Sequence, residues 1–300
     1  MGLFFSSDRF TRPGPGVRPD APRKKGVARL AEIMGRDMWN FFRAGFLAFL
    51  GCLPFIIGMF FAVETHALLF MLLAGIIGGL IAGPELSAMA DTVLRSLRDE
   101  PGYWWETYRR VWKRNARESL VPGMLTGLVL SMQIFTLFHM SVISAGIVTW
   151  VLLILSFVIT LGLESYIWPQ IALLDLPLYG ILKNSLLLFL GYLPRSLGAI
   201  AIKAVYWGAI LLFFPLTTII LPFTNFWLPM LPALLCIYQP LNKCFTIEST
   251  INKMREDELN AALAKDNEPL PEDPTEKAEE STEASSDDSS SDLSLIHISE

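Results

Sequence analysis

Two ionisable residues lie within apolar segments, where a charge is costly and usually serves a function. Glu164 follows the apolar run 142–163, and Lys203 lies inside the run 196–214. Both are expected in the same half of a membrane, so the sequence predicts an intramembrane polar pair. This pair could relay a proton or a substrate. Alternatively, it could be a structural salt bridge, or two groups that each reach towards the interface.

Other patterns that usually indicate chemistry are missing from the sequence. His66 and His139 fall between apolar runs, and there is no H-E-x-x-H or C-x-x-C spacing. Cys52, Cys236 and Cys244 are interpreted as small apolar residues of helices. No G-x-S-x-G motif or phosphate-binding glycine loop occurs. We therefore expect no catalytic residue, no metal and no cofactor, and a protein that is not an enzyme.

The chain is too apolar for a soluble domain of its length. Hydrophobic residues make up 52% and charged residues 18% of 300 residues, and the mean hydropathy is +0.45. Apolar runs of about 20 residues are long enough to cross a bilayer as helices. The sequence predicts six such runs, and hence an all-α polytopic membrane helix bundle, with spans at 42–63, 67–89, 120–138, 142–163, 196–214 and 226–245.

Composition divides the chain into a membrane domain with polar ends. Residues 1–25 are predicted to be a flexible basic proline-rich arm, and residues 26–258 a helical membrane domain with cytoplasmic amphipathic helices near 27–40 and 86–117. The acidic segment 259–292 is expected to be a disordered tail. The octapeptide 293–300 resembles a translated sequencing adapter, so we expect it to be an artefact.

The distribution of lysine and arginine predicts the orientation. Nine bases lie between Arg9 and Arg43, and none lies between spans one and two, three and four, or five and six. The other bases, Lys203 excepted, follow spans two, four and six or lie at the end of span six. The positive-inside rule then predicts a multi-pass protein of the cell membrane with both termini in the cytoplasm.

Bases and aromatic residues are interleaved in the segment before span three. We define the cationic segment by Trp104, Trp105, Tyr108, Arg109, Arg110, Trp112, Lys113, Arg114 and Arg117. Helical spacing places the aromatic residues, with Val111 and Asn115, on one side and the bases around the rest. Such a helix suits anionic headgroups, and docking of a partner is the alternative. We expect no nucleic acid to bind there.

Small residues recur every four positions in spans two and three. Gly75, Gly79 and Gly83 form one stripe, and Gly123 and Gly127 form another. Four-residue spacing brings the glycines to one helix face and allows close contact between backbones. The stripes predict packing of span two on span three within one chain. A homodimer seam is the alternative.

Several segments together resemble a known family. They are Cys52-Leu53-Pro54 with Gly58, Gly83-Pro84 with Ala88, and the run Trp105, Tyr108, Arg109, Trp112, Lys113, Arg114, Asn115. Over residues 27–245 the chain resembles the YesL-like bacterial membrane proteins, with one additional apolar span. The resemblance implies an accessory role near carbohydrate uptake systems and supplies no catalytic residues.

These observations predict a non-enzymatic membrane protein that binds a partner, such as a membrane transport complex, near a carbohydrate uptake system. The alternative is a small secondary transporter or channel, favoured by the Glu164 and Lys203 pair and by glycine and proline within spans two and six.

Overall fold

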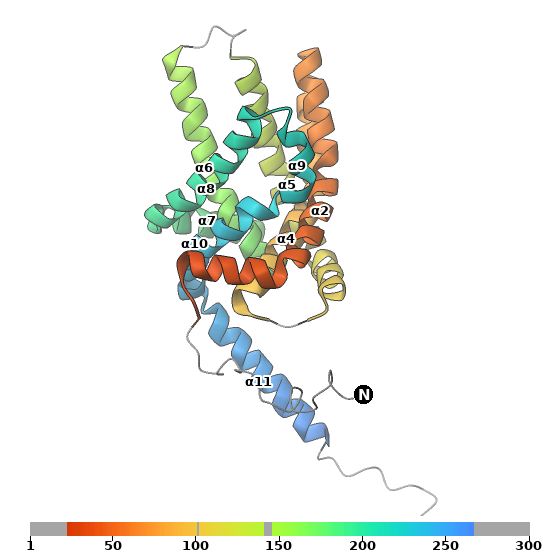
Figure 1. Cartoon of the computed structure of the whole chain (residues 1–300), viewed down its shortest axis with the longest axis vertical. Coiled ribbons are helices and arrows are strands. Elements are labelled where there is room, and N and C mark those ends of the chain that lie inside the picture. The colour runs from red at the N-terminus through yellow and green to blue at the C-terminus, as the bar shows by residue number, and fades with distance from the viewer. Residues whose placement is uncertain (1–22, 101, 141–145, 267–300) are drawn as a thin grey trace, which may run out of the picture. The chain divides into compact units, whose positions relative to one another are not determined.

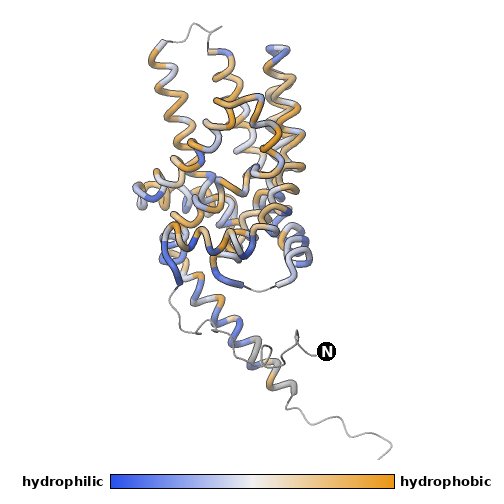
Figure 2. Tube along the Cα trace, in the orientation of Figure 1, coloured by the Kyte–Doolittle hydropathy of each residue, from blue (hydrophilic) through white to orange (hydrophobic). Residues whose placement is uncertain are grey.

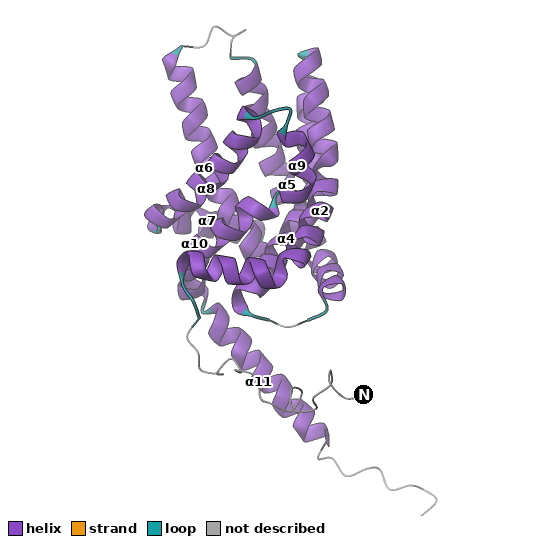
Figure 3. Ribbon diagram, viewed as in Figure 1, coloured by secondary structure: helices purple, strands orange, loops and turns teal. Residues whose placement is uncertain are grey.

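The chain is helical in the residues that its computed structural model describes, 23–100, 102–140 and 146–266, and no strand occurs among them (Figure 3). The prediction of an all-α bundle is confirmed. In order, the elements are α2 (Gly26–Thr65), α3 (Leu68–Leu73), the π-helix η1 (Ala74–Gly78), α4 (Gly79–Arg98), α5 (Trp104–Phe138), α6 (Ile147–Leu173), α7 (Leu178–Gly191), α8 (Leu193–Leu212), α9 (Thr217–Thr224), α10 (Trp227–Phe245) and α11 (Ile247–Asp266).

Six helical segments are long and apolar enough to cross a membrane. They are Gly26–Thr65, Leu68–Arg98, Trp104–Phe138, Ile147–Leu173, Leu193–Leu212 and Leu221–Phe245. Figure 2 shows hydrophobic residues along these segments and hydrophilic residues near the turn between α4 and α5. Many large apolar side chains point outwards, such as Ile147, 81% exposed, and Leu152, 60% exposed. Lipid tails would cover these side chains, as in a multi-pass membrane protein.

The first span and the helix before it are one element. The sequence suggested separate helices at 27–40 and 42–63, but α2 runs unbroken from Gly26 to Thr65. Its one proline, Pro54, lies beyond the junction, so nothing there removes a backbone hydrogen bond. In Figure 1 the red beginning of α2 runs across the end of the bundle, and the orange remainder runs along it.

Helix α4 lies at the centre of the membrane unit. It packs against α2, α5, α6 and α10, and its buried residues lie around most of its circumference. Its second half contains Asp91, Ser96 and Arg98, all buried. The sequence predicted an amphipathic helix here, with a single buried face. Its periodicity alone cannot show how many other helices surround it.

Several helix ends differ from the sequence-based boundaries. The fourth span starts at Ile147 and continues to Leu173, ten residues beyond the predicted end. The 14-residue helix α7 was not predicted; at about 1.5 Å per residue it is too short to cross a bilayer. Between the predicted spans 196–214 and 226–245 lies the short helix α9.

The chain forms two compact units, Met1–Ile247 and Glu248–Glu300. In the second unit the described residues belong to α11, which ends at Asp266. This helix runs past the predicted boundary between domain and tail at residue 258 and includes residues 259–266. Residues 1–22 of the predicted arm 1–25, residues 267–292 of the predicted tail and the octapeptide 293–300 lie outside the described residues.

Candidate functional site

The glycine stripes of spans two and three face each other within the chain. A Cβ atom added to Gly79 would lie 2.9 Å from the Gly123 carbonyl carbon, and one added to Gly127 would lie 2.8 Å from the Gly79 Cα atom. Gly75 faces Ser131 and the backbone of Leu128 in the same way. Gly83 likewise lies against Ser119 and Gly123. Both stripes are therefore occupied by contacts between η1–α4 and α5.

The first half of α5 has one buried stripe. Tyr108, Val111, Asn115 and Ser119 point inwards, and the Tyr108 hydroxyl donates to Glu85 Oε2 at 2.5 Å. Spacings of three and four residues place these side chains on one helical face. This stripe orients the rest of the cationic segment.

The aromatic residues of the cationic segment lie near one another on α5 but differ in burial: the Trp104 ring centre is 5.8 Å from that of Trp105 and 5.3 Å from that of Tyr108. Trp105 is 57% exposed and Trp112 is 36% exposed, whereas Trp104 is half-buried. The Arg43 guanidinium lies 5.6 Å from the Trp104 ring centre, within the range of a cation–π contact. Only Tyr108 of the aromatic residues points fully inwards, because Trp105 and Trp112 lie to the side of the buried stripe.

Three bases of the cationic segment remain available. Arg109, Lys113 and Arg117 are exposed, and none of their side chains forms an ion pair or hydrogen bond within the described part of the chain. By contrast, Arg110 pairs with Glu106 at 3.0 Å, and Arg114 donates to the carbonyl of Ala172 at 2.8 Å. Arg109, Lys113 and Arg117 can therefore bind an external anion, whereas Arg110 and Arg114 already have partners within the chain.

The C-terminus of α4 is held by bases from the start of the chain. Arg23, Arg29 and Arg36 donate to the carbonyls of Arg98, Leu97 and Ser96, at 3.1, 3.1 and 2.8 Å. All three also pair with the Asp99 carboxylate. Positive charge suits this helix end, because its last carbonyls have no partners within the helix and carry negative potential. We call this arrangement the arginine clamp.

Asp99 belongs to the arginine clamp in two ways: its backbone ends α4, and its carboxylate pairs with the arginines. It ends α4 in the left-handed region, with φ 59°. Burial raises its pKa, but hydrogen bonds from Arg36 and Arg29 outweigh burial and hold the pKa below its ordinary value. The carboxylate thus stays ionised near neutral pH. Sequence reasoning missed the clamp: the amphipathic helix predicted near 27–40 contains Arg29 and Arg36, but its pattern gives no sign of a contact with the end of α4.

The predicted intramembrane pair is formed. Lys203 Nζ lies 3.8 Å from Glu164 Oε2, and the side chains are 9% and 17% exposed. Trp168 Nε1 also donates to Glu164 Oε1 at 3.3 Å. A small cavity beside the pair is lined by both residues and by Ser165, Pro169, Met230, Ala233 and Leu234. The arrangement can neutralise a buried charge, and it can also pass a proton between two adjacent groups.

His66 and His139, which lie between different pairs of apolar runs in the sequence, are in contact in the structure. His66 Nδ1 is 2.6 Å from His139 Nε2, and the rings meet edge to face. His66 ends α2 and His139 ends α5, so the contact joins two turns. Among the residues that the structure describes, no three metal-ligating side chains gather. The spacing of 73 residues offered no signal for this contact.

Comparisons with protein-family models, with curated proteins and with solved structures found no match for this chain.

Proposed function

We propose that the protein is a non-enzymatic multi-pass membrane protein that presents the cationic segment to a partner at the cytoplasmic face. One observation supports this proposal most directly. Arg109, Lys113 and Arg117 form an exposed set of bases without ionic partners in the described residues. The buried stripe of α5 holds their helix in place, so little order has to be gained on binding.

The proposed orientation rests on charge. Bases cluster before span one and after spans two and four, whereas the segments between spans one and two, three and four, and five and six have none. With six spans, both ends of the membrane domain then lie on one side, and the positive-inside rule assigns that side to the cytoplasm of the cell membrane.

The proposed partner is an acidic cytoplasmic surface of a membrane transport complex. Charge complementarity favours such a surface, because a rim of bases accelerates association and excludes basic partners. The resemblance of residues 27–245 to YesL-like proteins makes a carbohydrate uptake system the first class of partner to test. Anchoring of the same bases to anionic headgroups is the competing use of this surface.

Affinity purification from native membranes tests the proposal. The triple variant Arg109→Gln, Lys113→Gln, Arg117→Gln is compared with a control that removes three exposed bases elsewhere, Lys183→Gln, Lys253→Gln and Arg255→Gln. We expect the wild type and the control to retain a sugar-transport permease or its binding protein, and the triple variant to lose it.

Flotation with vesicles separates the two uses of the surface. Under the proposal, the wild type in nanodiscs binds anionic vesicles no better than the triple variant in nanodiscs does. Equal partner recovery by the wild type and the triple variant, together with lost vesicle binding in the variant, would show that the bases serve the membrane instead.

A second candidate function is transport by the protein itself. The buried contact between Glu164 and Lys203, next to a small cavity, favours it. Pro169 lies in the same helix as Glu164, and Pro232 lies in α10, whose residues also line the cavity; each proline removes a backbone hydrogen-bond donor from its helix. Proteoliposomes that contain a pH-sensitive dye and radiolabelled maltose would test this function. Transport requires flux that Glu164→Gln abolishes and that the exposed-site control Glu256→Gln retains.

A further inference from the structure

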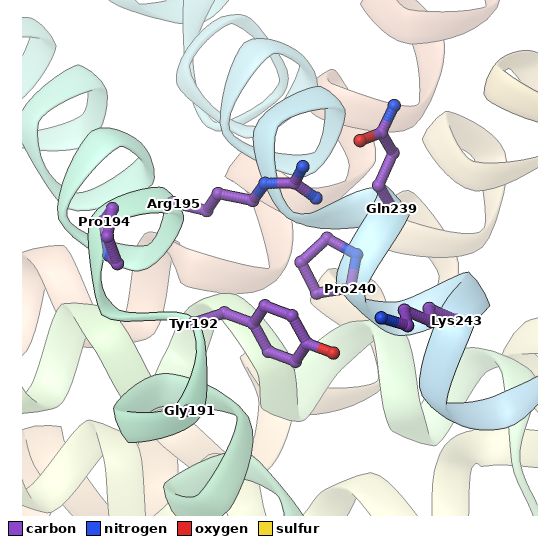
Figure 4. Close-up of a pocket in the computed structure, with 7 residues that line it drawn as sticks. All are labelled: Gly191, Tyr192, Pro194, Arg195, Gln239, Pro240 and Lys243. Carbon is purple, nitrogen blue, oxygen red and sulfur yellow. The ribbon is translucent and has the colours of Figure 1, made fainter.

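A cavity of about 500 Å³ lies between the α7–α8 turn and the end of α10 (Figure 4). Its lining comprises Gly191, Tyr192, Pro194, Arg195, Gln239, Pro240 and Lys243. This size lies within the range of small-ligand sites. The cavity is separate from the Glu164 and Lys203 pair and from the cationic segment, because it shares no lining residue with either.

Donor groups dominate the polar part of the lining. Arg195 and Lys243 carry positive charge, Tyr192 and Gln239 add neutral donors, and no acidic residue is present. In Figure 4 the Tyr192 side chain extends from the α7–α8 turn, and the Arg195 side chain from the start of α8, towards α10, which carries Lys243. Guanidinium binds two oxygens of a phosphate side by side, and the lysine amine adds a point charge. The chemistry of the cavity thus suits an anion with several oxygens.

The two bases have no ionic partner of their own. Neither side chain forms an ion pair or a hydrogen bond with another residue in the ranges that the structure describes. The Tyr192 hydroxyl contacts Cys244 Sγ, next to Lys243 in sequence, at 3.6 Å. Two like charges that share a cavity repel each other, and a bound anion would relieve this repulsion.

The cavity also lies at a defined depth. Arg195 is the third residue of α8, and Lys243 is the third residue from the end of α10. Both helices belong to candidate spans that run in opposite directions, so their facing ends reach the same membrane surface. A span of about 20 residues is about 30 Å long, which puts its end residues at the headgroups.

From these observations we propose that the cavity binds the phosphate group of an anionic phospholipid. Basic pockets between membrane helices are suited to acidic headgroups. The Pro194 and Pro240 side chains supply an apolar wall for the glycerol part of the lipid. The inference is independent of the proposed function, because α5 contributes nothing to the lining.

Calorimetric titration of the full chain in detergent tests the assignment. The probes are short-chain phosphatidylglycerol, short-chain phosphatidylcholine and inorganic phosphate. We expect phosphatidylglycerol to bind, and the double variant Arg195→Gln, Lys243→Gln to weaken its binding about 25-fold, at about fivefold per base. A control with two bases removed outside the cavity, Lys183→Gln and Lys253→Gln, should bind as the wild type does.

Two further measurements keep the test decisive. Thermal unfolding without lipid should be the same for the double variant and the wild type, because both bases are exposed and unpaired in the described chain. Arg195→Lys keeps the charge but loses the planar fork, so its loss of affinity should be smaller than that of Arg195→Gln.

Unchanged phosphatidylglycerol affinity in a folded double variant would overturn the proposal, as would equal binding of phosphatidylcholine. Binding of inorganic phosphate without binding of phosphatidylglycerol would overturn the lipid assignment and point to a soluble phosphate compound.

Discussion

The guanidinium of Arg29 lies 2.6 Å from the carboxylate of Asp99, although 70 positions separate the two residues in sequence. The same side chain donates to the Leu97 carbonyl and is only 6% exposed. A single buried base thus joins the start of α2 to the end of α4. The arginine clamp fixes the turn that leads into the cationic segment, so its stability bears on how that segment is presented.

Removal of this base should destabilise the fold. Arg29→Gln removes the buried donor to the Leu97 carbonyl and one of three arginines that pair with Asp99, and we expect a loss of about 2 kcal/mol in the free energy of unfolding. Denaturant unfolding in detergent micelles measures it. The exposed control Arg109→Gln should change stability by about 0.5 kcal/mol or less. Equal stability of the two variants would mean that the clamp contributes little.

The Asp99 carboxylate should make stability depend on pH. Its pKa in the folded chain is lowered: burial raises it, and the bonds from Arg36 and Arg29 more than offset this. The stabilisation is therefore present above the ordinary aspartate pKa of about 4, and it is lost as the pH falls through the lower folded pKa.

Melting temperatures of the wild type and Asp99→Asn between pH 7 and pH 3 measure this dependence. The wild type should melt higher by a constant margin at neutral pH, and the margin should shrink below about pH 4. Asp257→Asn, an exposed change on α11, should show no such margin. A margin that grew in acid would contradict the direction of the pKa shift.

Glu164 and Lys203 should be coupled in stability. Glu164→Gln alone leaves a buried amine, and Lys203→Met alone leaves a buried carboxylate, so each is expected to cost about 3 kcal/mol. The double variant leaves neither charge and should cost less than the sum of the two. Unfolding of the four proteins gives the coupling energy. Additive losses would show that the pair acts as two independent groups.

The contact of the glycine stripes should tolerate no side chain. A Cβ atom at Gly79 would lie 2.9 Å from the Gly123 carbonyl carbon and 3.1 Å from the Met124 Cα atom. These are backbone atoms, so the helices would have to separate, and Gly79→Ala should cost about 1–3 kcal/mol. Thermal unfolding in micelles measures the loss.

The matched control for the stripes is Gly198→Ala, where an added Cβ meets nothing within 4 Å. Since alanine favours a helix over glycine by about 1 kcal/mol, this change should leave stability the same or raise it. A Gly79→Ala protein as stable as the wild type would show that η1–α4 and α5 are not in close backbone contact at Gly79.

Local rules were enough for the main architecture. The lengths of the apolar runs predicted six spans, because a helix must be about 30 Å long to cross the hydrocarbon. Four-residue spacing identified the glycine stripes, since it depends only on the helical period. The pair of Glu164 and Lys203 followed from depth alone: both side chains lie at similar distances from span ends, and water is not available to either.

Other contacts depend on which helices meet. Arg29 and Arg36 have the spacing of a surface helix, and only the position of α4 turns them into ligands for its C-terminus. His66 and His139 are ordinary turn residues until two hairpins bring them together. The cavity at Arg195 and Lys243 likewise needs the start of α8 beside the end of α10.

Composition and periodicity act within one helix, and they were enough to predict the membrane-spanning helices, their close-packing faces and the clusters of charge. The tertiary structure decided which charges are neutralised and which remain exposed, because an ion pair requires two helices to meet in one arrangement. The sequence could therefore identify Arg109, Lys113 and Arg117 as members of a basic cluster. That these three are exposed and have no ionic partner in the described residues became known only from the structure.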